Sequence, residues 1–135
     1  MSDDRAPDVT MVRIELDELP PAGLRLHLDR VRWTDASFQL WAFLNLPDER
    51  LVDATLDDPC FADLFTMYGA GDRADRALGE IFLDAVLTLR RAVIERVGRV
   101  DANVVTLMPR DIDGAPLRDV ALEIGHLRVE PLTSR

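Results

Sequence analysis

The residues best suited to acid–base chemistry or metal binding are few and far apart in this chain. Its two histidines, His27 and His126, each stand beside an alternating apolar stretch. Imidazoles on neighbouring strands could share a metal ion, but a zinc site needs three or four ligands and further groups that orient them. The sequence therefore favours a structural or surface role for both histidines. We expect no metal and no cofactor.

The single cysteine, Cys60, is the other candidate for chemistry. It follows the acidic pair Asp57-Asp58, and a negative field raises a thiol pKa and suppresses the reactive thiolate. Packing is therefore its expected role. The aspartate pairs lack the spacing of a calcium loop, and residue order alone suggests no Ser-His-Asp arrangement. We expect the chain not to be an enzyme.

Short strands are the elements that would position these residues. Alternating apolar residues predict strands at 12–16, 24–28, 38–46, 61–68, 103–108 and 120–124. Pro20, Pro21 and Gly23 predict a turn, so we expect the first two strands to pair as a hairpin. The predicted fold is mainly β: a compact antiparallel β-sandwich or barrel of six to seven strands with one α-helix.

The segment 72–97 fits two structures. Its apolar residues recur at a helical period and would suit one amphipathic helix of about seven turns. Gly79 is unfavourable inside a helix, however, and Asp84 is a good N-cap. The family resemblance described in the next paragraph implies a strand near Glu80–Leu83 and then a shorter helix, and Gly79 and Asp84 lead us to favour this second structure, with the helix over Ala85–Val97 ending at Gly98. Whether residues 72–83 form helix or strand is left open.

Four stretches of the chain carry a family signature. FQLWAFLNLPDE, from Phe38, and DPCFADLFTMYG, from Asp58, resemble the strand and F-A-G-x-F pattern in the C-terminal β-barrel domain of polyphenol oxidases, or tyrosinases. VVTLMPRDIDG and VALEIGHLRVEPL resemble the closing strands of that domain. The similarity runs from about Leu24 to Pro131. The chain departs from the family in having Asp63 where glycine is usual and in lacking a histidine after Gly69.

This resemblance implies a role in binding. A tyrosinase holds two coppers with six histidines, and this chain has two histidines, so it cannot itself be the oxidase. In polyphenol oxidases the domain is non-catalytic, packs over the mouth of the copper domain and keeps the enzyme latent. A stand-alone copy also resembles the peptide-binding proteins of crocagin-type ribosomal peptide (RiPP) pathways, which hold a precursor peptide for the modifying enzymes. The alternative is a shielding or chaperone subunit acting in trans on a tyrosinase-type copper oxidase.

The aromatic face of the strand at 38–46 is the candidate peptide-binding surface. Trp41 and Phe43 alternate with the expected core residues, and Trp33, Met67 and Tyr68 are expected beside them. Aromatic residues and methionine are enriched at protein interfaces, and a sheet edge can accept an extended peptide. A helix over Ala85–Val97 packed on this face is the competing interpretation, because it would cover the aromatic side chains.

Charge and the chain ends set the remaining expectations. The net charge is −9, and residues 1–67 hold 14 acidic residues against 6 arginines. Such a field repels phosphate backbones, so we expect no nucleic-acid partner, whereas basic peptides would be attracted.

No apolar run suits a membrane span, and the acidic N-terminus lacks a secretory signal, which favours the cytoplasm. We expect a disordered tail at 1–8, a single domain at 9–132, and pairing of strand edges in a homodimer as one further arrangement.

Overall fold

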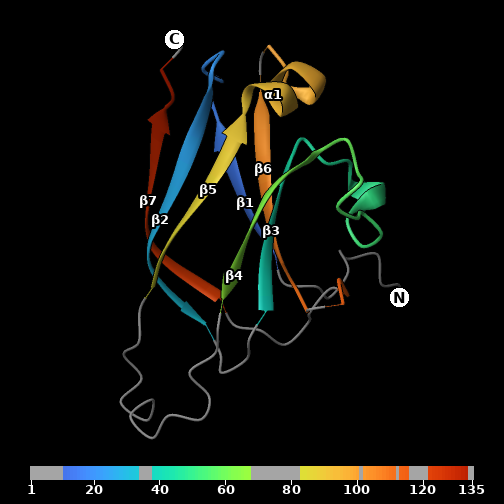
Figure 1. The fold of residues 1–135 in the computed structure, drawn as a ribbon, viewed down its shortest axis with the longest axis vertical. Coiled ribbons are helices and arrows are strands. Elements are labelled where there is room, and N and C mark those ends of the chain that lie inside the picture. The colour runs from blue at the N-terminus through green and yellow to red at the C-terminus, as the bar shows by residue number, and fades with distance from the viewer. Residues whose placement is uncertain are drawn as a thin grey trace, which may run out of the picture.

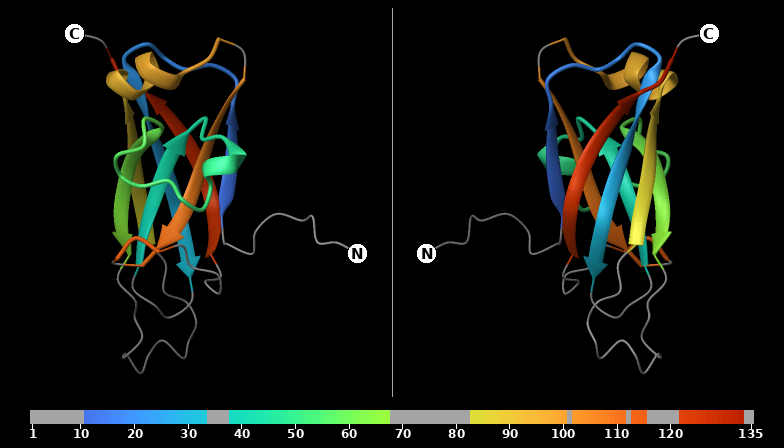
Figure 2. Two further views of the ribbon diagram at one scale, coloured as in Figure 1. Left: turned by 90° about the vertical axis from the view of Figure 1, so that its right-hand side faces the viewer. Right: turned by 90° about the vertical axis from the view of Figure 1, so that its left-hand side faces the viewer.

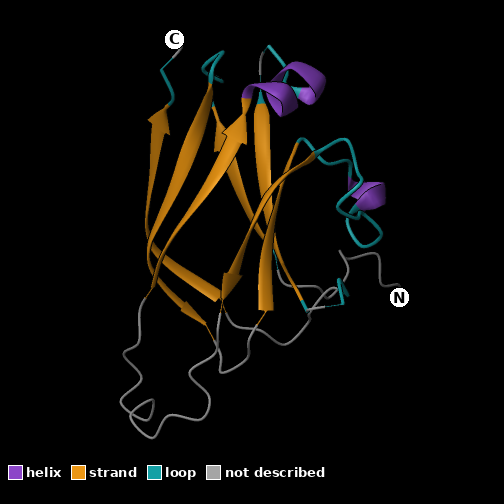
Figure 3. Cartoon of the chain, viewed as in Figure 1, coloured by secondary structure: helices purple, strands orange, loops and turns teal. Residues whose placement is uncertain are grey.

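Two antiparallel sheets make up the structure, a computed structural model that describes residues 11–33, 38–67, 83–100, 102–111, 113–115 and 122–133 (Figure 1). The strands are β1 (Val12–Leu16), β2 (Gly23–Trp33), β3 (Phe38–Leu44), β4 (Phe61–Met67), β5 (Leu83–Arg90), β6 (Asn103–Arg110) and β7 (Leu122–Pro131). The described residues also form the 3-10 helix η1 (Asp48–Arg50) and the α-helix α1 (Arg91–Val97), which lie outside the sheets (Figure 3).

The sheets face each other as a sandwich. One has the strand order β1-β6-β3-β4 and the other the order β5-β2-β7. All neighbouring strands are antiparallel. The predicted mainly β fold of six to seven strands with one α-helix is therefore confirmed, and it takes the sandwich form.

The predicted hairpin between the first two strands is wrong. Ile14 of β1 lies opposite Val105 of β6, whereas Leu26 of β2 lies between Leu87 of β5 and Val129 of β7. The chain thus crosses from one sheet to the other between β1 and β2. Both strands carry one apolar face, and placing them in opposite layers lets these faces meet in a shared core.

The predicted helix over Ala85–Val97 is also wrong in its first half, which is strand β5. Ala85, Leu87 and Leu89 are all 0% exposed, as expected for the inward face of a strand. Asp84 is not an N-cap: its Oδ1 accepts a hydrogen bond from the main-chain N–H of Arg30 at 3.0 Å. The rest of the segment for which two structures were considered, residues 72–82, lies outside the described residues.

The helix α1 is only seven residues long and begins where β5 ends. Val93 anchors it on the core, and the N–H of Gly98 closes its last turn on the carbonyl of Ile94 at 2.8 Å. Gly98 therefore ends the helix as predicted. No helix in the described part of the chain combines the length and the apolar character needed to cross a membrane.

Two apolar cores lie on the two faces of the larger sheet. The main core fills the space between the sheets and includes Leu26, Leu40 and Leu107, all fully buried. The second core lies on the outer face, where Trp41, Phe43 and Met108 are covered by the segment from Asn45 to Cys60 (Figure 2). Strand β3 is consequently buried on both sides, which explains why both of its alternating faces are largely apolar.

A pair of asparagines joins the end of β3 to the start of β6. Asn45 has φ of 56° and donates through Nδ2 to Asn103 Oδ1 at 2.9 Å and to the carbonyl of Val97 at 2.8 Å. Its Oδ1 accepts from the N–H of Val104 at 2.8 Å. Asn103 in turn accepts from the N–H of Arg99. Both asparagines are buried, so their polar groups need partners within the protein, and they find them in main-chain groups where α1 leads into β6.

Candidate functional site

The structure places the five residues predicted for peptide binding in different environments. Trp41 is 5% exposed and Phe43 is 0% exposed, so both belong to the second core. The main chains of Trp33 and Met67 lie in β2 and β4, but their side chains are outside the described set, and Tyr68 lies wholly outside it. For these three residues the peptide contact stays a prediction.

Trp41 and Phe43 pack as a cluster with Phe61. The ring centroids are 6.2 Å apart for Trp41 and Phe43, 6.1 Å for Trp41 and Phe61, and 5.8 Å for Phe43 and Phe61. Such tilted and edge-on geometry is typical of aromatic cores. The 45–60 segment covers the aromatic face, whereas a helix over Ala85–Val97 was the predicted cover. These two side chains therefore contribute to stability and offer no open surface to a ligand.

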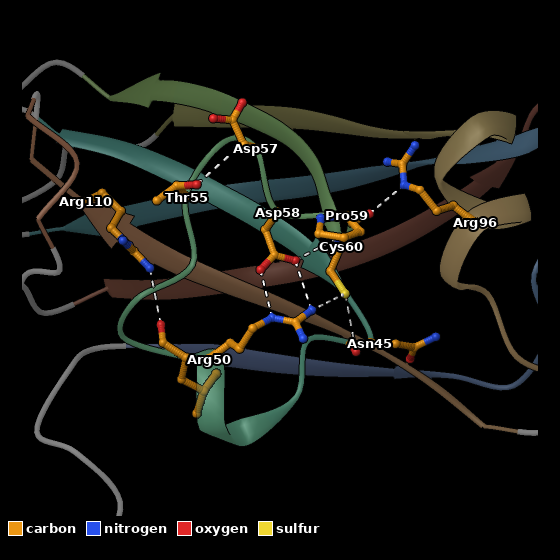
Figure 4. A network of polar contacts seen from close by, with 10 residues as sticks. Asn45, Arg50, Thr55, Asp57, Asp58, Pro59, Cys60, Arg96 and Arg110 are labelled. Carbon is orange, nitrogen blue, oxygen red and sulfur yellow. Dashed lines mark hydrogen bonds and ion pairs between the residues drawn. The ribbon is translucent and has the colours of Figure 1, made fainter.

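An ion pair between Arg50 and Asp58 links two parts of the 45–60 segment (Figure 4), which covers the aromatic cluster. Arg50 donates from Nε to Asp58 Oδ2 at 2.9 Å and from Nη2 to Oδ1 at 3.2 Å, and the N–H of Cys60 also donates to Asp58 at 2.9 Å. Burial acts to raise the pKa of Asp58, but the bonds from Arg50 and Cys60 outweigh it and hold that pKa below its ordinary value. The charged pair thus fixes the fold of this segment.

Cys60 is buried beside that ion pair and has no features of a nucleophile. Its Sγ lies 3.6 Å from the carbonyl of Asn45 and 3.6 Å from Arg50 Nη2. Burial, followed by the charge of Asp58, raises its pKa, so the thiol form dominates near neutral pH. The expected packing role of Cys60 is confirmed.

The histidines do not form a metal centre with other described residues. His27 Nε2 lies 2.7 Å from Glu130 Oε1 on the outer face of the smaller sheet, while His126 is exposed on β7. Within the described ranges no three His, Cys, Asp or Glu side chains are grouped as metal ligands would be. The pKa of Glu130 lies below its ordinary value, first because of its hydrogen bond with His27 and further because of the nearby charge of Arg25.

The two sides of the sandwich differ. On one side the edge strands β4 and β5 are joined by Asp63, whose Oδ2 accepts a hydrogen bond from the N–H of Thr88 at 2.8 Å. On the other side the edge strands are β1 and β7, and among the described residues each pairs with one strand. β1 and β7 run in the same direction, toward the end of the sandwich that carries α1 (Figures 1 and 2).

A groove of about 540 Å³ lies between β1 and β7, and we call it the β1–β7 groove. Its apolar lining is Val12, Ile14, Ile124 and Leu127, and its polar lining is Arg13, Glu15 and His126. Ile124 and Leu127 are half-buried, although their partners on the central strand β2, Val31 and Leu28, are fully buried. Arg13 is already paired with Asp48 at 2.8 Å. The groove therefore offers apolar contacts between two strands that, as far as the described residues go, pair along one edge only.

Sequence reasoning did not find this groove. The alternation at 12–16 and 120–124 predicted strands with one apolar face, but that pattern is the same for an edge strand and for a central one. The burial of Arg110 was also not predicted, because an arginine at the end of a strand pattern does not show whether another segment covers it. Its guanidinium lies 4.9 Å from the Trp41 ring and donates to the carbonyls of Gly114 at 2.9 Å and Leu51 at 3.2 Å. In the sequence, the only signal at Arg110 is its place after Pro109 in the stretch VVTLMPRDIDG.

The fold and the groove together define the class of this domain. It is an antiparallel β-sandwich whose described residues join the two sheets at β4 and β5 and form a groove between β1 and β7. Similar solved structures belong to a polyphenol oxidase. Recombinantly expressed latent aurone synthase matches 92% of this chain with a TM-score of 0.53 and 17% identity, over 24% of its own length. The same enzyme co-crystallised with hexatungstotellurate(VI) matches 98% of this chain with a TM-score of 0.52 and 15% identity, over 26% of its length.

These matches confirm the polyphenol oxidase resemblance as a likeness of fold. The chain spans about a quarter of the length of the enzymes that it matches, so their activity does not transfer with the fold. No family model and no curated protein matches the chain.

Proposed function

We propose that this chain is a non-catalytic peptide-binding protein that holds an extended precursor peptide for the modifying enzymes of a ribosomal peptide pathway. The observation that carries the proposal is the β1–β7 groove. Its two strands each pair along one edge only within the described residues, and they flank apolar side chains that are buried at Ile14 and half-buried at Val12, Ile124 and Leu127. An extended peptide can add to such an edge as a further strand, with main-chain hydrogen bonds supplying affinity and alternate side chains supplying specificity.

The chemistry of the groove suits holding a peptide better than reacting with it. Its lining contains one histidine, His126, and one carboxylate, Glu15, but no cysteine or serine. A general base and a nucleophile within hydrogen-bond reach would be needed for acyl transfer. Apolar contacts and strand pairing require neither. The net charge of −9 further favours peptides that carry basic residues.

Calorimetry with a synthetic peptide tests the proposal. The peptide should match the 10 residues of β7 in length and alternate valine with threonine after an arginine pair. We expect micromolar binding that weakens with added salt, because charge attraction is screened. Ile124→Glu places a charge in the groove and should abolish binding. Val86→Glu is the matched control, since Val86 is 39% exposed on the outer face of the smaller sheet.

A second groove variant guards against misfolding of the first. Val12→Glu introduces the same charge from β1, and circular dichroism will show whether each variant keeps its strands. Equal affinity in the wild type and in both folded groove variants would refute the proposed binding site. If the peptide gives no heat with the wild-type protein, the peptide-binding function itself is refuted. Sedimentation of the free protein tests the predicted homodimer, which would use the same edges.

A shielding subunit acting in trans on a copper oxidase is the second candidate. It is favoured by the structural matches, because a latent polyphenol oxidase contains a region with this fold that makes up about a quarter of its length. The purified chain should then lower phenol oxidation by a tyrosinase in a dose-dependent way, or alter its copper loading. Unchanged oxidation and unchanged copper content at saturating chain concentration would rule this function out.

A further inference from the structure

A second groove lies at the end of the sandwich that carries α1, directly beyond the end of β1. It has a volume of about 720 Å³ and runs between the β1–β2 connection and α1. Its apolar lining is Leu19, Pro21, Ile94 and Val100, and Val100 is 95% exposed. We call it the α1-end groove. Residues 12–15 of β1 line the β1–β7 groove and residues 17–19 line the α1-end groove, with the buried Leu16 between them in the chain.

Negative charge dominates the α1-end groove. Its lining contains the carboxylates of Asp17, Glu18 and Glu95 against one guanidinium, that of Arg99. All four residues are exposed, and none of the three carboxylates forms an ion pair or hydrogen bond within the part of the chain that the structure describes. Exposed carboxylates beside apolar surface suit the guanidinium or ammonium group of an incoming chain, whose aliphatic stem can lie on the apolar residues.

We infer that the two grooves form one continuous site for a single peptide, with a basic segment in the α1-end groove and an alternating apolar segment in the β1–β7 groove. This inference rests on the proposed peptide-binding function and specifies the ligand. Ile14 and Glu18 are at most roughly 13 Å apart, the span of an extended strand of that length, because the chain bends at Asp17. At most about four peptide residues therefore separate the apolar anchor from the basic one.

The strand directions also set the orientation of the peptide. β1 and β7 both run toward the α1 end (Figures 1 and 2), so one peptide can lie antiparallel to both. Antiparallel pairing is used throughout this sandwich. A peptide in that direction has its N-terminal end at the α1 end. The basic residues must therefore precede the apolar segment in the peptide sequence.

Three synthetic peptides test this arrangement by calorimetry. The first has an arginine pair before alternating valine and threonine, the second has the pair after them, and the third has none. We expect the wild-type protein to bind the first peptide about tenfold more tightly than the second or third, as several rim charges acting together allow. Replacing Asp17→Asn, Glu18→Gln and Glu95→Gln together should reduce affinity for the first peptide alone, to that of the third.

A matched variant separates the local groove from the overall field of the protein. Glu49→Gln, Asp53→Asn and Asp57→Asn remove the same charge from exposed positions on the 45–60 segment, and they should leave the preference for the first peptide intact. Equal losses in the two triple variants, or equal binding of the first and second peptides, would overturn the continuous site and leave the proposed function standing. Failure of all three peptides to bind the wild-type protein would overturn both.

Discussion

Asp63 and Thr88 join the two sheets of this protein: the carboxylate of Asp63, on the edge strand β4, accepts a hydrogen bond at 2.8 Å from the main-chain N–H of Thr88, on the edge strand β5. The Asp63 carboxylate also accepts from the N–H of Leu64 at 2.8 Å. An edge strand presents N–H groups without partners, and this side chain satisfies one of them. The bond marks the closed side of the sandwich, opposite the β1–β7 groove.

Removing the Asp63 carboxylate should loosen the closed side. The resemblance to polyphenol oxidases places glycine at this position, and Asp63→Gly or Asp63→Ala leaves the N–H of Thr88 without its acceptor. We expect either change to lower the free energy of unfolding by about 1–2 kcal/mol. Asp63→Asn keeps an acceptor and should cost less. Urea denaturation measures the difference, with the exposed Asp57→Ala as control, and a loss as small as that of the control would show that the bond is not stabilising.

Asn45 has a left-handed backbone conformation and a side chain that makes three hydrogen bonds. Two substitutions can separate the contributions of these two features to stability. The Asn45 φ of 56° is left-handed, where a residue with a side chain is disfavoured. Asn45→Ala loses the bonds to Asn103, Val97 and Val104 and keeps the backbone cost, whereas Asn45→Gly loses the bonds alone. We expect the alanine variant to be less stable than the glycine variant by about 1 kcal/mol. Thermal unfolding tests this order, and the reverse order would contradict it.

Arg110 has a buried charged side chain that packs against Trp41 of the second core. It is 2% exposed, and its Nε has no hydrogen-bond partner among the described atoms. Burial lowers the pKa of Arg110, opposed by the nearby charge of Asp53. Arg110→Ala should destabilise the protein by roughly 2–4 kcal/mol, because it leaves a cavity and two carbonyls without a donor.

Arg110→Met separates packing from charge. Methionine fills most of the same volume without a charge to desolvate, so it should recover at least half of the loss seen with alanine. Guanidinium chloride denaturation of both variants measures the recovery. Equal destabilisation by alanine and methionine would show that the hydrogen bonds and the contact with Trp41 outweigh the packing.

The ion pair of Arg50 and Asp58 predicts loss of stability in acid. The folded-state pKa of Asp58 lies below its ordinary value of 3.8. A carboxyl whose pKa is lowered by folding contributes its full stabilisation above the unfolded-state value, and it loses that contribution as the pH falls through the folded-state value. The stability difference between the wild type and Asp58→Asn should therefore be constant near neutral pH and shrink below about pH 4. A difference that grows in acid would contradict the assignment.

Local pattern was enough to predict much of the strand content. Leu24, Leu26 and Leu28 alternate with polar residues and are fully buried in β2, because an extended chain directs every second side chain to the same face. The same pattern failed between 85 and 89. Apolar residues there satisfy both a helical and an alternating period, and the strand forms because it pairs with β2 along its length.

Two features of the candidate site could not be predicted from the sequence: what covers Trp41 and Phe43, and which strands lie at the sheet edges. Trp41 and Phe43 were correctly placed on the face of β3 opposite the main core, but an alternating pattern does not say what covers a face. The 45–60 segment covers them, so the aromatic surface expected to bind a peptide is interior. Conversely, nothing in the alternation at 120–124 indicated that β7 would be an edge.

By itself, then, the sequence determined the class of fold, the likeness to a polyphenol oxidase domain, the packing role of Cys60 and the end of the helix at Gly98. Each depends on residues close together in the chain or on a short motif. The tertiary structure decided that β1 pairs with β6, that Asp63 closes one side of the sandwich, and that Ile14 and Leu127 face one groove. These features depend on which distant segments meet, and that choice is made by burying all the apolar faces at once.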